Sequence, residues 1–194
     1  MTPIDTSRIE AAVAEILAAI GEDPARPGLA TTPQRIAESY RDFFGGVGVD
    51  PVPELMDGAE MATTPEERGE LVLLRDIALR SMCEHHLLPF TGVAHVAYVP
   101  EERIIGLGRI PRLVQIVSAR PQLQERLGED VAAALETAVE PAGVLVVIDA
   151  KHGCVAARGV RYAESTTVTV AARGVLADPV RQAGVLALIG RSEA

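Results

Sequence analysis

The pattern of apolar residues changes near Glu70, and this change constrains the fold more than any other feature of the sequence. Before it, apolar residues recur at helical spacing over 8–20 and again over 32–44. The second stretch opens with Thr32-Pro33, a favourable helix start. The stretch 47–69 is rich in turn formers and acids, so it is interpreted as a long connection. Two N-terminal helices are therefore predicted ahead of a body of different character.

Beyond Glu70, β-branched and alternating runs predict strands over 70–80, 92–100, 103–108, 143–150 and 164–176. Helical spacing returns in three places, over 109–118, over 121–139 and after Asp178-Pro179. Strands separated from helices in this way indicate an α+β protein, in which an antiparallel sheet packs on two helices. The expected organisation is an N-terminal helical region with its connection at 1–69, followed by the main domain at 70–194.

Composition excludes several classes of protein. The chain has 194 residues, of which 48% are hydrophobic and 23% charged, enough to bury a core. A formal net charge of −9 argues against a nucleic-acid binder. We expect no membrane span, because no apolar run approaches about 18 residues, and no signal peptide begins the sequence. The expected location is the cytoplasm, where thiols stay reduced.

Residues able to carry chemistry gather in two short clusters. One is Cys83-Glu84-His85-His86 and the other is His152-Gly153-Cys154, and together they hold both cysteines and three of the four histidines. Each cluster follows a strand-like run. Sites are commonly built where strands of a rigid sheet end in loops, so both clusters are candidate site segments.

The clusters contain a ligand set that suits zinc. Cys83 and His86 are three residues apart, so one turn can direct both at a single point, and Cys154 would complete a Cys₂His set. Three protein ligands leave a fourth position for water, as in catalytic zinc sites. His85 and His152 would then remain as acid–base groups. Two alternatives stay open: the cysteines could be small buried hydrophobes or could form a disulfide.

A second group of residues suggests anion and purine binding. Arg109, Arg112 and Arg158 could converge on phosphates through charge-assisted hydrogen bonds, although solvated surface charges would look the same. Gln124-Glu125 could hold the N–H edge of a guanine. As residues alone, this pair is better interpreted as an ordinary polar pair on a helix surface.

Longer motifs resemble one known family, and the resemblance covers nearly the whole chain. The chain resembles GTP cyclohydrolase I. The matching segments are Thr32-Pro33-Gln34-Arg35-Ile36-Ala37, Ser81-Met82-Cys83-Glu84-His85-His86-Leu87-Leu88-Pro89-Phe90, His95-Val96-Ala97-Tyr98-Val99-Pro100, Arg120-Pro121-Gln122-Leu123-Gln124-Glu125-Arg126-Leu127, and His152-Gly153-Cys154 with Arg158-Gly159-Val160.

The resemblance implies a fold, an assembly and a reaction. The fold is the tunnelling fold, and the assembly is a homodecamer with active sites at subunit interfaces. The reaction opens the imidazole ring of GTP, releases C8 as formate and rearranges the ribose. Its product is 7,8-dihydroneopterin triphosphate, which leads to folate or other pterins.

The resemblance also implies residue roles. Cys83, His86 and Cys154 would hold one zinc ion per subunit, whose water attacks C8. His152 would be the main proton donor and acceptor, and His85 would assist. The remaining expected roles concern the substrate: Glu125 with Gln124 at the guanine edge, and Arg112, Arg158 and Arg109 at the triphosphate.

Two departures from the family pattern concern the phosphate end. Gly108-Arg109 stands where the family usually has Ser-Lys, which removes a hydroxyl and alters the geometry of the charge. Val155-Ala156-Ala157 replaces a methionine-rich stretch. A paralogue of the same fold therefore stays open as an interpretation, one that would stop at the ring-opened formamide or serve a deazapurine pathway. The sequence is also compatible with a non-catalytic purine- or pterin-binding protein and with a disulfide-linked secreted module.

Overall fold

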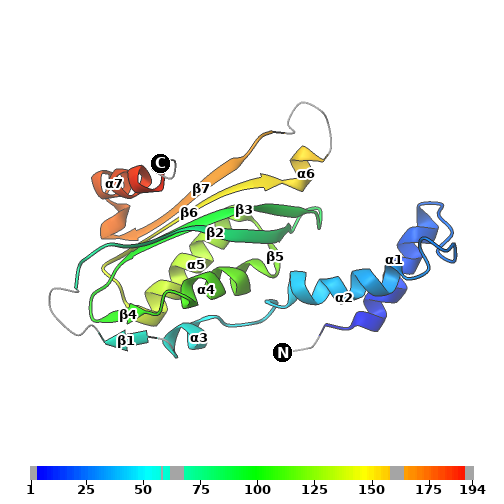
Figure 1. The fold of residues 1–194 in the computed structure, drawn as a ribbon, viewed down its shortest axis with the longest axis horizontal. Helices are drawn as coiled ribbons and strands as arrows, with labels where there is room; N and C mark the ends of the chain where they lie inside the picture. Colours follow the sequence, from blue (N-terminus) through cyan, green and yellow to red (C-terminus); the bar gives the residue numbers. More distant parts are fainter. Residues whose placement is uncertain (1–3, 58, 62–67, 158–163, 191–194) are drawn as a thin grey trace. The chain divides into compact units, whose positions relative to one another are not determined.

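The computed structural model describes residues 4–57, 59–61, 68–157 and 164–190. The chain divides into two compact units, an N-terminal unit at Met1–Val49 and a C-terminal unit at Asp50–Ala194 (Figure 1). This division lies earlier than the expected boundary between 69 and 70. The reason is that part of the connection is structured: helix α3 (Val52–Met56) packs against two helices of the C-terminal unit, and strand β1 (Ala59–Met61) pairs with one of its strands.

The N-terminal unit holds the two expected helices, α1 (Thr6–Ala19) and α2 (Thr32–Phe44), which pack against each other. The Asp5 carboxylate accepts a hydrogen bond from the backbone N–H of Arg8 and caps α1. Pro33 occupies the first turn of α2, where its missing N–H costs nothing.

The C-terminal unit is built on a five-stranded sheet in the described residues, with the strand order β5-β2-β3-β6-β7. All neighbours are antiparallel except β2 and β5. The strands are β2 (Val72–Cys83), β3 (Pro89–Val99), β5 (Pro121–Gln122), β6 (Gly143–His152) and β7 (Thr167–Gly174).

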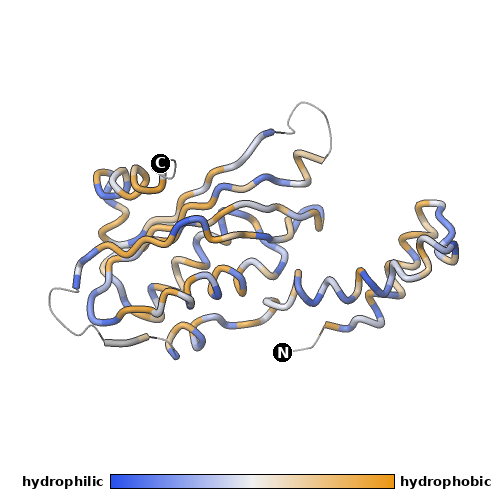
Figure 2. Tube along the Cα trace, in the orientation of Figure 1, coloured by the Kyte–Doolittle hydropathy of each residue, from blue (hydrophilic) through white to orange (hydrophobic). Residues whose placement is uncertain are grey.

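Helices α4 (Arg109–Ser118) and α5 (Gln124–Val139) cover one face of the sheet (Figure 1). The main core lies between these two helices and the sheet, and β3 contributes Ala94, Val96 and Tyr98 to it. The opposite face of β3 contributes Ala97 and Val99 to a smaller core with the 3₁₀ turn η3 (Val175–Ala177) and helix α7 (Pro179–Ile189). Figure 2 shows β6 hydrophobic through its middle and hydrophilic at the end next to α6. The predicted α+β class is confirmed.

Two local expectations were wrong. The run 103–108 supplies only the short strand β4 (Arg103–Ile105), which pairs with β1 outside the main sheet. Pro121 does not begin a helix, because residues 121–122 add a parallel strand beside the end of β2 and the helix starts at Gln124. In both cases a long-range partner decided the outcome, and local periodicity carries no information about such partners.

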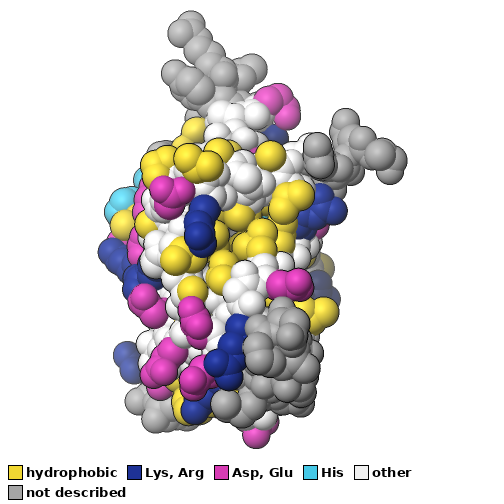
Figure 3. All heavy atoms as spheres, turned by 90° about the vertical axis from the view of Figure 1, so that its left-hand side faces the viewer, with side chains coloured by type: hydrophobic (Ala, Val, Ile, Leu, Met, Phe, Trp, Pro, Cys, Tyr) yellow, Lys and Arg dark blue, Asp and Glu magenta, His cyan; other side chains and the backbone are white. Residues whose placement is uncertain are grey.

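The end of the C-terminal unit that carries α7 presents hydrophobic side chains among charged ones (Figure 3). Val180, Leu186 and Leu188 of α7 are exposed there. Within the described ranges, no helix combines the length and the apolar character needed to cross a membrane.

Candidate active site

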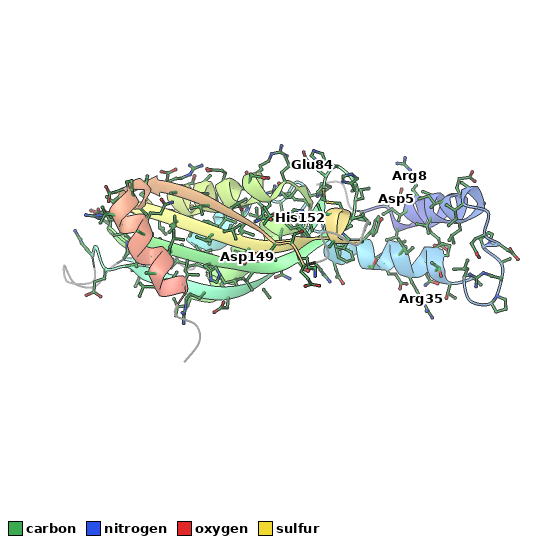
Figure 4. All side chains as sticks on the ribbon, turned by 90° about the horizontal axis from the view of Figure 1, so that it is seen from above. Asp5, Arg8, Arg35, Glu84, Asp149 and His152 are labelled. Carbon is green, nitrogen blue, oxygen red and sulfur yellow. The ribbon has the colours of Figure 1, made fainter. Side chains whose placement is uncertain are left out.

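Strand register brings the two reactive clusters to one end of the sheet. Cys83 is the last residue of β2 and His152 is the last residue of β6. Strand β3 lies between them, and its residue Phe90 pairs with Ser81 on one side and with His152 on the other. Figure 4 shows Glu84 and His152 at this same end. Strands β2 and β6 are both antiparallel to β3, so their C-terminal ends lie at the same end of the sheet. This arrangement brings together segments about 70 residues apart in the sequence.

A tight turn after β2 aligns the first two ligand candidates. The carbonyl oxygen of Cys83 accepts hydrogen bonds from the backbone N–H groups of His86 and Leu87, at 3.3 and 2.9 Å. Leu87 takes a positive φ of 50° to close this turn. As a result, Cys83 Sγ and His86 Nδ1 lie 3.8 Å apart.

The third candidate is presented by a short turn of helix, α6 (Gly153–Ala156). This turn lies very close to β3, because a Cβ atom at Gly153 would be 2.7 Å from the carbonyl oxygen of Pro89. Only glycine avoids that overlap. The close approach places Cys154 Sγ 3.9 Å from Cys83 Sγ.

These three side chains fit a zinc ion. Their ligand atoms all lie within 4.8 Å of one another. Two sulfur atoms each about 2.3 Å from a tetrahedral zinc are about 3.8 Å apart, close to the observed sulfur separation. A disulfide needs a sulfur separation of about 2.05 Å, and Cys83 and Cys154 are not joined in one, so the disulfide alternative does not hold. Cys83 is buried and His86 is exposed, so the group opens toward the surface.

His152 is half-buried beside this group, and two contacts hold its ring. The ring stacks on Phe90 with a centroid distance of 4.7 Å and an interplanar angle of 9°. Its Nε2 atom lies 2.7 Å from Gln124 Oε1. Burial lowers the pKa of the His152 imidazole below its usual value, and the negative charge of Glu125 offsets part of that shift.

Gln124 differs from the surface residue that the local sequence suggested. Its side chain is only 1% exposed. The amide nitrogen donates to three acceptors, the carbonyl oxygens of Ile148 at 3.0 Å and Thr167 at 2.8 Å and the hydroxyl of Thr169 at 3.1 Å. Glu125, the next residue, is exposed and is the member of the pair that a ligand can reach.

In the same turn His85 is exposed and Glu84 is half-buried. His85 Nε2 lies 4.0 Å from a Glu84 carboxylate oxygen. The same carboxylate forms an ion pair with Arg126 at 2.6 Å, which links the turn to α5. His85 is therefore next to the ligand group without being part of it.

Two of the expected phosphate-binding arginines lie elsewhere in the fold. Arg109 pairs with Asp57 at 3.1 Å and Arg112 pairs with Glu54 at 3.0 Å. They line an open cavity of about 430 Å³ together with Glu54, Gly106, Leu107 and Gly108.

Helix α4 separates this cavity from the Cys/His group. Its last residue is next to β2, since the Ser118 carbonyl oxygen accepts a hydrogen bond from Ser81 Oγ at 2.7 Å. Arg109 begins the helix, and ten residues of α-helix span about 15 Å. Arg109 and Arg112 instead direct their side chains to the carboxylates of Asp57 and Glu54. The expected role of Arg158 falls outside the described residues.

Comparison with known proteins places this site in a family. The family model for GTP cyclohydrolase I matches residues 9–190. The chain belongs to the GTP cyclohydrolase I family. That confirms the resemblance found in the sequence, and the match includes every described residue of the site.

Similar proteins carry the same family name. The GTP cyclohydrolase 1 of Leifsonia xyli subsp. xyli is 57% identical over 190 residues, covering 98% of each chain. That of Rhodopirellula baltica is 47% identical and covers 97% of this chain and 81% of its own. These relatives confirm the predicted enzyme class, a GTP cyclohydrolase. Among solved structures, the archaeosine synthase QueF-Like in the apo form has a TM-score of 0.45 and 22% identity, and covers 54% of this chain and 93% of its own.

Three residues near these sites were not anticipated from the sequence. Phe90 supports the His152 ring, and its place in an alternating strand just after the Cys/His cluster was an available signal. Glu54 and Asp57 lie in the stretch interpreted as a connection. No local signal marks them as arginine partners, because the pairing depends on how α3 packs against α4.

Proposed function

We propose that this GTP cyclohydrolase I family member holds one zinc ion and hydrolytically opens the imidazole ring of GTP. The C8 atom leaves as formate, and rearrangement then gives 7,8-dihydroneopterin triphosphate. The observation that carries the proposal is the convergence of Cys83, His86 and Cys154 within 4.8 Å, next to the half-buried His152. When bound, zinc supplies a polarised water for hydrolysis near neutral pH.

The chain's own residues hold the substrate and move its protons. His152 is placed to take and return protons at the purine, because its ring is fixed by Phe90 and Gln124. Glu125 is exposed beside it and accepts hydrogen bonds from the guanine edge. His85 is exposed on the turn that follows β2 and assists proton transfer.

We infer that the triphosphate is bound by arginines of a neighbouring subunit. Arg109 and Arg112 lie in the half of α4 that is farther from the Cys/His group of their own chain. A subunit interface would bring them to the Cys/His group of a neighbouring chain. Arg158 is proposed as a further phosphate ligand.

Sheet edges support the assembly. In the described residues β7 pairs only with β6, and the outer edge of β2 pairs only at residues 82–83. Open edges of this kind can pair with a strand of a neighbouring copy. We propose a homodecamer with shared sites. The cytoplasm is the proposed location, because a ligand set with two thiolates requires reduced cysteines.

Two adjacent histidines provide a matched test of the metal site. His86→Ala removes a proposed ligand, so zinc content measured by mass spectrometry should fall from about one per subunit to near zero, and formate release from GTP should stop. His85→Ala should keep its zinc. Zinc retained by His86→Ala would contradict the ligand assignment.

Product mass tests the reaction itself. Wild-type protein loaded with zinc should release formate from GTP and form a pterin that fluoresces after oxidation. A ring-opened formamide as the end product would favour the paralogue alternative. If no formate is released, the proposed reaction is wrong even though the family assignment stands.

A further inference from the structure

The side chain of Gln124 connects α5, β6 and β7 to the ring of His152. We propose that Gln124 is a positioning residue, which holds His152 in a single ring orientation and in the tautomer that carries its proton on Nε2. The inference rests on the proposed function only in taking His152 as the group that moves protons.

Backbone acceptors determine which way the Gln124 amide points. One terminal atom lies 3.0 Å from the carbonyl oxygen of Ile148 and 2.8 Å from that of Thr167. Carbonyl oxygens only accept hydrogen bonds, so this atom must be the amide nitrogen. The other terminal atom is therefore the carbonyl oxygen, which lies 2.7 Å from His152 Nε2.

This orientation decides the tautomer of His152. An amide oxygen can only accept, so the ring nitrogen facing it must donate. A neutral imidazole carries one N–H, and placing it on Nε2 leaves the lone pair on Nδ1. The other tautomer would set two lone pairs against each other at 2.7 Å and would lose a buried hydrogen bond. Nδ1 is thus the nitrogen left to accept a proton from a ligand.

The same contacts leave the side chain of Gln124 without a role in binding the purine. Its side chain is 1% exposed, both of its polar atoms are hydrogen-bonded to the protein, and its amide hydrogens point into the sheet. Glu125 follows it directly and is exposed. The two residues therefore have different proposed roles. Glu125 contacts the ligand, and the side chain of Gln124 positions His152.

Gln122 provides a matched control. It is also a buried glutamine, 2% exposed, and its amide nitrogen donates to Asp130 at 2.9 Å and to the Val117 carbonyl oxygen at 3.4 Å. Gln122→Met and Gln124→Met remove the same group from the same segment. Both variants should lose stability, but only the second removes the partner of His152.

Steady-state kinetics separate positioning from substrate binding. In zinc-loaded protein, Gln124→Met should lower kcat for formate release from GTP by about 10- to 100-fold, the usual effect of losing such a partner, with KM changed less than about twofold. Gln122→Met should keep kcat within about threefold. A raised KM with unchanged kcat in Gln124→Met would overturn the proposal and make Gln124 a substrate contact.

Solid-state ¹⁵N NMR of histidine-labelled protein tests the tautomer independently of activity. Spectra are recorded with and without zinc, at a pH where the imidazole is neutral, and the His152→Ala spectrum assigns the signal. Wild type should show Nε2 protonated and Nδ1 unprotonated, and Gln124→Met should show both tautomers. Protonated Nδ1 in wild type, or an unchanged spectrum in Gln124→Met, would overturn the proposal. A wild type inactive on GTP would instead refute the proposed function, and the NMR result would remain valid.

Discussion

At the scale of single residues, two histidines of the same sheet are held by opposite hydrogen bonds. His95 Nδ1 accepts from the backbone N–H of Asp76 at 3.2 Å, where β2 has a bulge and Asp76 takes a φ of 58°. His95 is buried, and this contact gives it a structural role. His152 Nε2 instead lies 2.7 Å from the Gln124 oxygen, to which we propose that it donates. The partner of each ring, rather than the residue type, separates a structural histidine from a proposed catalytic one.

The buried His95 should make stability depend on pH. Burial lowers its pKa below 6.5, and Arg75 adds to this shift while Asp76 and Asp149 oppose it. Near and below pH 6.5 the unfolded chain therefore binds more protons than the folded chain. The free energy of unfolding should fall as the pH drops from about 7 to about 5.

His95→Gln tests this dependence by urea denaturation at several pH values. The loss of stability between about pH 7 and pH 5 should be smaller in the variant than in wild type, because His152 and the carboxylates are common to both. Equal slopes in the two proteins would show that His95 does not contribute.

At the scale of elements, the site is an end of the sheet rather than a loop cluster. Strand β2 and its turn supply Cys83 and His86, β6 supplies His152, and α6 supplies Cys154. Because β3 pairs with both strands, its register sets the separation between the two clusters. The close approach of Gly153 to Pro89 is the point at which this arrangement is most sensitive.

Gly153→Ala should disturb the ligand group. The added methyl group would lie 2.7 Å from the Pro89 carbonyl oxygen, so α6 must shift, at a cost of about 1–3 kcal/mol in the free energy of unfolding. Zinc affinity should fall as Cys154 moves. Thermal melting and competition with a chelator measure the two effects.

Gly184→Ala is the control for this substitution. Gly184 lies within α7 with open space around it, and alanine there should stabilise the helix by about 0.5–1 kcal/mol without changing zinc affinity. Unchanged zinc affinity in Gly153→Ala would show that α6 adjusts without moving Cys154.

At the scale of the whole molecule, two of the expected phosphate-binding residues, Arg109 and Arg112, pair with carboxylates away from the Cys/His group of their own chain. Arg112 is paired with Glu54 at the start of α4, and the Cys/His group lies beyond the other end of that helix. Within the ranges that the structure describes, the outer edge of β7 and that of β2 before Met82 have no strand partner, which would allow a neighbouring copy to dock. A site shared between subunits would reconcile the family's activity on a triphosphate with this separation.

Mixed oligomers test the shared site. Arg112→Ala and His152→Ala, each tagged differently, should be nearly inactive alone. After co-expression and purification by both tags, activity should return to about a quarter of wild type, because random mixing rebuilds that fraction of interfaces with both groups intact. Formate release measures the recovery. No recovery, with mixed oligomers present, would place both groups in one subunit's site.

Local sequence was enough to establish the two N-terminal helices, the α+β class, the family and the Cys/His clusters, because helix periodicity, strand alternation and short motifs depend on neighbouring residues. Only the tertiary structure decided that Gln124 is buried under His152, that Arg109 and Arg112 pair with Asp57 and Glu54, and that 103–105 pairs with 59–61. Each of these depends on strand register or helix packing between distant segments, and such pairing is set by the whole packed core rather than by any stretch of the chain.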